Sequence, residues 1–136
     1  MKFIGPLSCL MVTVTSLGLV AAGAAQQGAA PATPQTREAV LARGATLYRA
    51  RCASCHELDR NKIGPMHRGV VGRRSATVAG FSYSPALRNA GITWTPAALD
   101  TWLAGPQRMV RGSRMYLVVA SPTDRAAIIA HLERQR

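Results

Sequence analysis

Residues 52 to 56, Cys52-Ala53-Ser54-Cys55-His56, constrain the fold of this chain more than any other feature. Two cysteines three positions apart, with a histidine directly after the second, form the motif that attaches c-type haem. In such a site the thiols add across the two vinyl groups of the porphyrin, and His56 lies beneath the ring, where its imidazole can bind the iron. The motif therefore predicts one haem held through Cys52, Cys55 and His56.

Two other uses of a C-x-x-C pair are thiol redox chemistry and half of a zinc site. A zinc site needs a second ligand pair at a similar spacing, whereas Cys9, His67 and His131 each stand alone in the sequence. A thioredoxin-like motif needs βαβ surroundings, and the flanking pattern here is helical. Haem attachment is therefore the favoured interpretation.

The first 25 residues have the features of a secretory signal peptide. Lys2 gives a positive start, residues 7 to 20 form an apolar stretch, and small residues at 22–25 offer a cleavage site near Ala24 or Ala25. The alternative is an uncleaved membrane anchor, but the apolar run is short for a full span. Export suits haem attachment and predicts a periplasmic protein. Residues 26–36 are predicted to be a disordered leader, and residues 37–136 a single domain.

The chain is strongly basic, with 17 Lys and Arg against 6 Asp and Glu in 136 residues, a net charge of +11. A field of this sign favours acidic partners and speeds association with them. Nucleic acid is another partner of basic chains, but the basic residues are scattered and form no helical stripe. We expect docking onto the acidic surfaces of other proteins and no nucleic-acid binding.

Proline and hydroxyl residues mark most of the expected helix starts. Ser84-Pro85, Thr95-Pro96 and Ser121-Pro122 each combine an N-cap with a proline at the first helical position. No alternating strand pattern occurs, so the predicted fold class is all-α, with long loops at 63–82 and 106–120. Loops of this length need something to pack on, and a haem supplies it. Helices are expected from after Thr36 to Cys52, from Pro85 to Gly91, from Pro96 to Gly105 and onward from Pro122.

The sixth ligand of the iron separates electron transfer from small-molecule chemistry. A thioether raises the reduction potential and closes the iron, whereas a second histidine lowers the potential. Met66 is too close in sequence to His56 to cross easily to the other face, and His131 belongs to the last helix. Met109 and Met115 both lie in the second loop, and the residue pattern alone does not separate them. The candidates considered are Met66, His67, Met109, Met115 and His131.

From about Gly44 to the end of the last helix the chain resembles the class I cytochrome c family. Any one of the shared motifs is weak, but their order and spacing together are specific. The resemblance implies a small cytochrome c fold, with helices and long loops wrapped around one covalently bound haem. The motifs are Gly44-x-x-x-Tyr48-x-x-x-Cys52, CASCH, Gly64-Pro65, Gly69-Val70-Val71-Gly72-Arg73, Gly80-Phe81-Ser82-Tyr83-Ser84, Gly91-Ile92-Thr93-Trp94-Thr95, Trp102-Leu103-x-x-Pro106, Gly112-Ser113-Arg114-Met115, and Arg125 with Ile129-Ala130-His131-Leu132.

The resemblance also implies roles for matched positions. Met115 falls where the family has its axial methionine, which leaves Met109 as a packing residue. Pro65 matches the proline whose carbonyl accepts the hydrogen bond of the axial histidine. The remaining matches concern a haem propionate: Tyr83, Trp94 and Ser113 stand at hydrogen-bonding positions, and Arg73 at the position that offsets its charge.

Two histidines depart from the family pattern. His67 replaces an apolar residue that packs near the haem, and we interpret this as a local shift that turns His67 outward and lets Met66 fill the space. The alternative is a stand-in ligand that binds when Met115 leaves the iron. His131 replaces an aromatic residue where the last helix crosses the first, which predicts a weaker crossing.

The resemblance implies a periplasmic electron carrier with one His56- and Met115-ligated haem c, which is not an enzyme and has no small-molecule substrate. Its partners would be a bc1-type complex or periplasmic dehydrogenase as donor and a terminal oxidase as acceptor, and the chain would be a monomer or a subunit of a hetero-complex. One alternative is a dedicated haem subunit of a periplasmic dehydrogenase. The other is an open-site ligand-binding or peroxidatic haem protein, against which Met115 argues.

Overall fold

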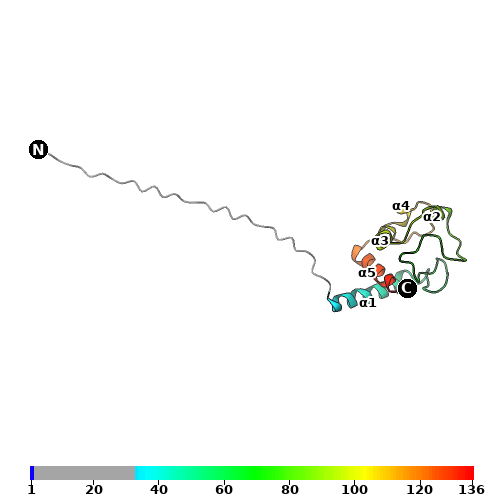
Figure 1. Cartoon of the computed structure of the whole chain (residues 1–136), viewed down its shortest axis with the longest axis horizontal. Helices are drawn as coiled ribbons and strands as arrows, with labels where there is room; N and C mark the ends of the chain where they lie inside the picture. The colour runs from blue at the N-terminus through cyan, green and yellow to red at the C-terminus, as the bar shows by residue number, and fades with distance from the viewer. Residues whose placement is uncertain (2–32) are drawn as a thin grey trace. The chain divides into compact units, whose positions relative to one another are not determined.

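The computed structural model describes Met1 and residues 33–136 of the chain. Within these residues the only β-pairing is an isolated bridge between Arg74 and Thr93, so the all-α prediction is confirmed. The expected signal peptide, apart from Met1, and residues 26–32 of the expected leader lie outside the described residues. The helices are α1 (Pro34–Arg51), α2 (Pro85–Asn89), α3 (Pro96–Ala104), α4 (Pro106–Met109) and α5 (Pro122–Glu133), joined by long irregular segments (Figure 1).

The helix α1 begins at Pro34 rather than after Thr36, so the expected leader overlaps it at residues 34–36. The reason is a cap that the sequence reading missed. The Thr33 hydroxyl accepts a hydrogen bond from the Thr36 amide at 3.2 Å, and Pro34 occupies the first turn. This is the same Thr/Ser-Pro device that starts α2, α3 and α5.

The segment expected to be a loop from residue 106 to 120 starts with the single helical turn α4. Pro106 supplies the fixed φ of a first helical position, and the Val110 amide closes the turn by donating to the Pro106 carbonyl at 2.8 Å. The loop prediction is therefore wrong for residues 106–109.

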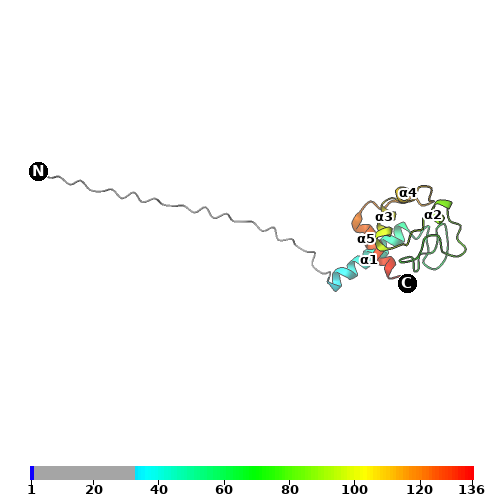
Figure 2. The same cartoon turned by 45° about the horizontal axis from the view of Figure 1, so that its top comes forward.

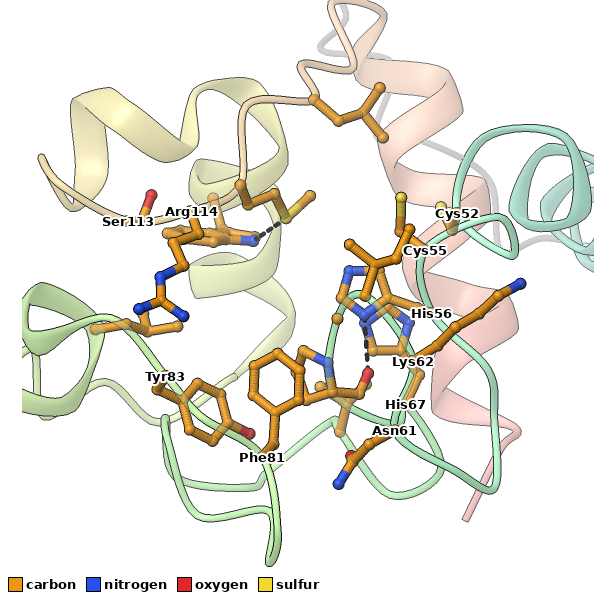
Figure 3. A pocket seen from close by; sticks show the side chains of 18 of the residues that line it. Cys52, Cys55, His56, Asn61, Lys62, His67, Phe81, Tyr83, Ser113 and Arg114 are labelled. Atoms are coloured by element: carbon orange, nitrogen blue, oxygen red, sulfur yellow. Dashed lines mark hydrogen bonds between the residues drawn. The ribbon is translucent and has the colours of Figure 1, made fainter.

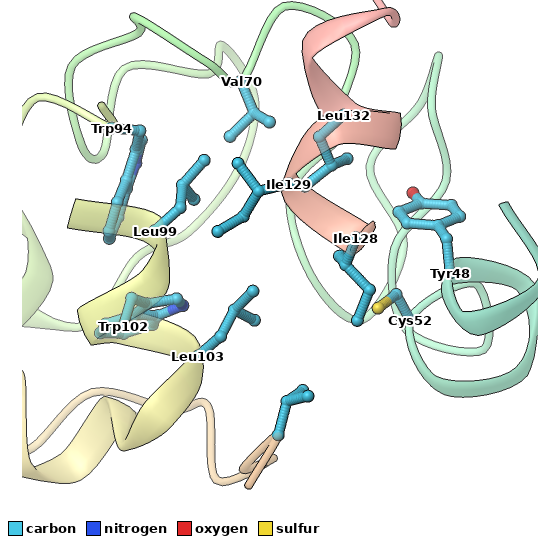
Figure 4. Close-up of a cluster of buried hydrophobic side chains, with 11 residues drawn as sticks. Tyr48, Cys52, Val70, Trp94, Leu99, Trp102, Leu103, Ile128, Ile129 and Leu132 are labelled. Atoms are coloured by element: carbon cyan, nitrogen blue, oxygen red, sulfur yellow. The ribbon is translucent and has the colours of Figure 1, made fainter. Parts of the chain in front are cut away.

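A close crossing of α1 and α5 forms one side of the core, and α3 packs against the other side of α5 (Figure 1, Figure 2). Gly44 makes the crossing possible, since a Cβ atom there would lie 2.0 Å from the carbonyl oxygen of Ala127. Figure 4 shows the buried cluster between these helices. Its members are Tyr48, Cys52, Val70, Trp94, Leu99, Trp102, Leu103, Val119, Ile128, Ile129 and Leu132.

The buried side chain of Arg125 ties α5 to its surroundings. Its Nε donates to Asp100 of α3 at 2.7 Å, and its Nη1 donates to the carbonyls of Val119 and Ala120 at 3.0 and 2.8 Å. Because the buried guanidinium has these three hydrogen-bond partners, its charge and N–H groups are compensated and do not destabilise the fold. In the part of the chain that the structure describes, every helix is too short or too polar to cross a membrane.

Candidate functional site

A cavity of about 730 Å³ opens among residues 51–84, α3, residues 113–117 and α5 (Figure 3). This is within the range of about 300–1,000 Å³ found for small-molecule and cofactor pockets. Core side chains supply much of its wall, among them Leu99, Leu103, Ile128 and Leu132. The fold therefore carries a largely apolar pocket large enough for a cofactor.

The Cys-x-x-Cys-His segment forms a tight turn on this wall. The amides of Cys55 and His56 donate to the Cys52 carbonyl at 3.0 and 2.8 Å. Both cysteines are free thiols and line the cavity together with the imidazole (Figure 3). Burial raises the pKa of the Cys52 thiol to about 11. A thiol-exchange cysteine needs a lowered pKa, so the environment of Cys52 disfavours thiol redox chemistry.

The His56 imidazole is held in one tautomer and one position. Its Nδ1 lies 2.8 Å from the Pro65 carbonyl oxygen, to which only a protonated Nδ1 can donate. Nε2 is then the unprotonated nitrogen that can bind a metal. Gly64 lies against the ring, since a Cβ atom there would be 2.1 Å from His56 Cε1. Burial lowers the pKa of His56, and the hydrogen bond to Pro65 raises it by a smaller amount. The net shift is downward, which favours the neutral form that can bind a metal.

His67 lines the cavity and stacks on His56, with ring centroids 4.0 Å apart and an interplanar angle of 15°. The expectation that His67 turns outward is therefore wrong, and Met66 is not among the residues that line the cavity. Because His67 packs on the histidine itself, its position also argues against a stand-in ligand on the far side of a haem. Burial, followed by the nearby His56 and Arg73, lowers the pKa of His67 well below its usual range.

Met115 lines the cavity, whereas Met109 does not and packs against the hydrophobic cluster. The indole Nε1–H of Trp102 donates to the Met115 sulfur at 3.1 Å. The Gln107 amide nitrogen holds the same stretch, at 2.8 Å from both the carbonyl and the hydroxyl of Ser113 and 2.9 Å from the Met115 carbonyl.

Sequence reasoning missed the polar roles of Trp102 and Gln107. In the sequence, Trp102 stands out only as part of the Trp102-Leu103-x-x-Pro106 motif. A usable signal existed, because a buried indole N–H needs a hydrogen-bond partner. Gln107 carries no comparable signal, since its acceptors come from a loop whose path only the fold defines.

The polar residues expected around a propionate also line the cavity. Tyr83 and Trp94 are buried, and Ser113 is 1% exposed. Burial raises the pKa of Tyr83, while Arg73 nearby acts in the opposite direction. The Arg73 guanidinium donates to the carbonyls of Met66 and Arg68 at 2.7 and 2.9 Å, which holds it beside the cavity.

The charge around the cavity has one sign. Among the described residues that line it, none is Asp or Glu. The basic residues of the lining are Arg51, Lys62, Arg73, Arg74 and Arg114. An anionic ligand is therefore favoured there.

The residue types on this cavity fit a c-type haem. Cys52 and Cys55 provide two free thiols, His56 a neutral imidazole with Nε2 available, and Met115 a thioether, all on one apolar cavity. The basic lining suits the two carboxylates of the porphyrin.

Comparisons with known proteins agree with this description. The family model for cytochrome c matches residues 41–135. Cytochrome c-type cyt cy of Rhodobacter capsulatus is 42% identical over 91 residues, which are 65% of this chain and 46% of that protein, so the chain spans about half the length of this relative. Cytochrome c of Cochliobolus lunatus is 38% identical over 97 residues, 68% of this chain and 90% of that protein. Among solved structures, cytochrome cH from Methylobacterium extorquens superposes with a TM-score of 0.67 at 35% identity, over 69% of this chain and 97% of that one.

The fold and the cavity thus define a small all-α protein that wraps one covalently bound haem c. The chain belongs to the cytochrome c family, as a class I, mono-haem member. It is an electron-transfer haem protein and not an enzyme.

Proposed function

We propose that this cytochrome is a periplasmic electron carrier in which His56 and Met115 are the two axial ligands of the haem iron. The observation that carries the proposal is the pair of oriented donor atoms. His56 keeps Nε2 available because Nδ1 is held by Pro65, and the Met115 sulfur is held by Trp102, both on the cavity that Cys52 and Cys55 line. When bound, the haem supplies the one-electron ferric/ferrous couple.

The residues of the chain tether, orient and shield that group. Cys52 and Cys55 hold the porphyrin covalently, and the Pro65 carbonyl keeps the His56 ring in one orientation. The apolar wall formed by core residues such as Leu99 and Ile128 excludes water and lowers the local dielectric. His56 and Met115, each held by a neighbouring residue, would hold the iron from fixed positions, and the haem would supply the electron-transfer chemistry.

We further propose that Tyr83, Trp94 and Ser113 hydrogen-bond a haem propionate and that Arg73 offsets its charge. All four line the same cavity, and Tyr83 and Arg73 are close enough to influence each other's ionisation. A buried carboxylate needs such partners, because an unpaired one would be neutralised rather than buried.

Docking of redox partners would take place at the mouth of the cavity. Ile63 and Tyr116 line the cavity but are 75% and 74% exposed. Lys62, Arg74 and Arg114 belong to the same lining and are exposed, so both apolar and basic side chains of the lining reach solvent. Such a surface suits acidic faces on a bc1-type complex or periplasmic dehydrogenase as donor, and on a terminal oxidase as acceptor. The signal-like first 25 residues support the periplasmic location.

The axial ligands are tested by the absorption spectrum of the oxidised, haem-loaded protein. Methionine bound to ferric haem gives a weak charge-transfer band at the red end of the visible range. We expect this band in the parent protein and in Met109→Leu, and its loss in Met115→Leu. Absence of the band from the parent protein, or its survival in Met115→Leu, would overturn the assignment, and carbon monoxide binding to the reduced parent would indicate an open site.

Docking by charge is tested separately with an acidic redox partner. We expect the bimolecular electron-transfer rate to fall as ionic strength rises, because salt screens the attraction. The matched variant Arg114→Gln should show a slower rate and a shallower salt dependence, whereas Arg37→Gln, in the first turn of α1, should not. A rate that does not change with salt would refute the docking surface.

A further inference from the structure

His67 is a feature of the cavity that neither the family resemblance nor the proposed electron transfer explains. In the resemblance its position belongs to an apolar packing residue. Here an imidazole occupies it and lies almost parallel to the His56 ring, at 4.0 Å between centroids and 15° between planes. Figure 3 shows the two side chains together on the same side of the pocket. At this separation and angle the two rings are in face-to-face contact.

The backbone fixes His67 relative to His56. The His67 amide donates to the carbonyl of Glu57, the residue after His56, at 2.9 Å, and the next amide, that of Arg68, donates to the Leu58 carbonyl at 2.8 Å. These two bonds join residues 57–58 to residues 67–68. The backbone of His67 is therefore held directly to the residues that follow Cys52–His56, which fixes the position of its ring relative to His56.

A second aromatic ring supports His67 from α1. The Tyr48 ring lies 5.7 Å from the His67 ring at an angle of 57°, and the Tyr48 hydroxyl donates to the His56 carbonyl at 3.3 Å. Tyr48 is buried, with 4% of its surface exposed. His67 is thus packed between a fixed tyrosine and the His56 imidazole.

The polar atoms of His67 make a simple packing role unfavourable. Its Nδ1 is buried and has no hydrogen-bond partner among residues 33–136. A buried polar nitrogen without a partner destabilises the fold, so an aliphatic side chain of similar size would fill the same space at lower cost. The feature that an aliphatic side chain lacks is the flat face presented to His56.

Besides the stacked face, the contacts of His56 are the hydrogen bond to the Pro65 carbonyl and the backbone of Gly64, which lies against the ring. The Pro65 carbonyl restrains one atom, Nδ1, and the glycine at position 64 allows close backbone approach. A single hydrogen bond restrains a direction more than a plane, whereas a parallel ring restrains the plane directly. Contacts to the far side of a metal-binding histidine orient the ring and adjust its donor strength.

We propose that His67 is a positioning residue for the axial histidine, and that its stacked imidazole sets the plane of the His56 ring over the haem. The proposal rests on the proposed function, in which His56 binds the iron. In ferric low-spin haem the plane of an axial imidazole selects which iron orbital holds the unpaired electron. The expected consequences are a defined magnetic anisotropy and a defined reduction potential.

The test compares three variants of the haem-loaded protein. His67→Leu removes the flat face and keeps an apolar filler, and His67→Phe keeps a flat face. His131→Leu is the matched control, because it makes the same chemical change at a ring that contacts Tyr48 at 5.3 Å and not His56. The measurements are the electron paramagnetic resonance g values, the spread of haem methyl resonances in nuclear magnetic resonance, and the midpoint potential.

We expect changed g values, a changed methyl pattern and a shifted potential in His67→Leu, parent-like spectra in His131→Leu, and recovery toward the parent in His67→Phe. If the spectra and potential of His67→Leu equal those of the parent, or if His131→Leu changes them as much, the positioning role is refuted. If His67→Phe does not fold, the comparison of His67→Leu with His131→Leu still tests the positioning role. The methionine charge-transfer band of the parent distinguishes a failure of this proposal from a failure of the proposed function, because its absence refutes the His56/Met115 ligation itself.

Discussion

The hydrogen bond from Trp102 to Met115 should contribute to the reduction potential of the protein. The indole Nε1 lies 3.1 Å from the Met115 sulfur, and Trp102 is buried, with 7% of its surface exposed. A donor at this position draws electron density from the thioether and weakens its donation to ferric iron. The bond therefore favours the ferrous state, and Trp102→Phe, which removes the donor, should lower the potential.

The size of the shift follows from the strength of the bond. A buried hydrogen bond contributes about 0.5–1.5 kcal/mol net, and sulfur is a weak acceptor, so the two oxidation states should differ by about 0.5 kcal/mol. A one-electron couple moves by about 59 mV for each tenfold change in equilibrium constant, or about 1.4 kcal/mol. The expected decrease in Trp102→Phe is therefore about 20 mV.

The assay is a spectroelectrochemical titration of the haem-loaded parent and its variants. Trp102→Tyr retains a donor and should lie closer to the parent. Leu103→Val is the control for lost packing, since Leu103 is a buried neighbour that lines the same cavity and donates no hydrogen bond to Met115. An unchanged or raised potential in Trp102→Phe, with the methionine charge-transfer band still present, would refute the reasoning.

Three further predictions concern stability. Gly44→Ala should lower the free energy of unfolding by about 1–3 kcal/mol in urea denaturation, because its Cβ would lie 2.0 Å from the Ala127 carbonyl oxygen. A higher free energy of unfolding, as the greater helix propensity of alanine alone would give, would contradict the close crossing. Arg125→Met should cost about 1–3 kcal/mol by the same assay, because buried carbonyls lose their donor; parent-like stability would exclude this role. Burial, together with the nearby positive charge of Arg49, lowers the pKa of His131 below its ordinary value of 6.5. As the pH falls through this range, the unfolded chain binds more protons than the folded chain, so the free energy of unfolding decreases with acidification. His131→Leu should flatten this slope in urea midpoints measured across pH, and an unchanged slope would refute the assignment.

Much of the fold was readable from local signals. The Ser/Thr-Pro pairs before α2, α3 and α5 predicted helix starts because a cap and a proline act within one turn of chain. The same device stands at Thr33-Pro34, but the composition of the residues before it is typical of a leader and hides the helix start. The single turn α4 was missed because four residues carry too little periodicity to be distinguished from a loop.

His67 shows where local reasoning fails in the site. Its neighbours in sequence gave no reason to face inward, and the position belongs to an apolar residue in the resemblance. Its inward orientation depends on backbone pairing with residues 57–58 and on the Tyr48 ring from α1. Both contacts depend on how irregular segments and α1 fold back on one another, and local propensity does not encode this.

The sequence by itself determined the chemistry of attachment. Two thiols and an imidazole at the spacing of Cys52, Cys55 and His56 suit a covalently bound haem, because the three groups must meet one porphyrin from one turn of backbone. The family resemblance already favours Met115 over Met109, and the tertiary structure brings Met115 to the cavity wall. Only the tertiary structure adds the Trp102 donor and the inward-facing His67 ring, which neither the residue pattern nor the resemblance indicates. Covalent geometry acts over a few residues, whereas these contacts exist only after the helices and loops have packed around a common space.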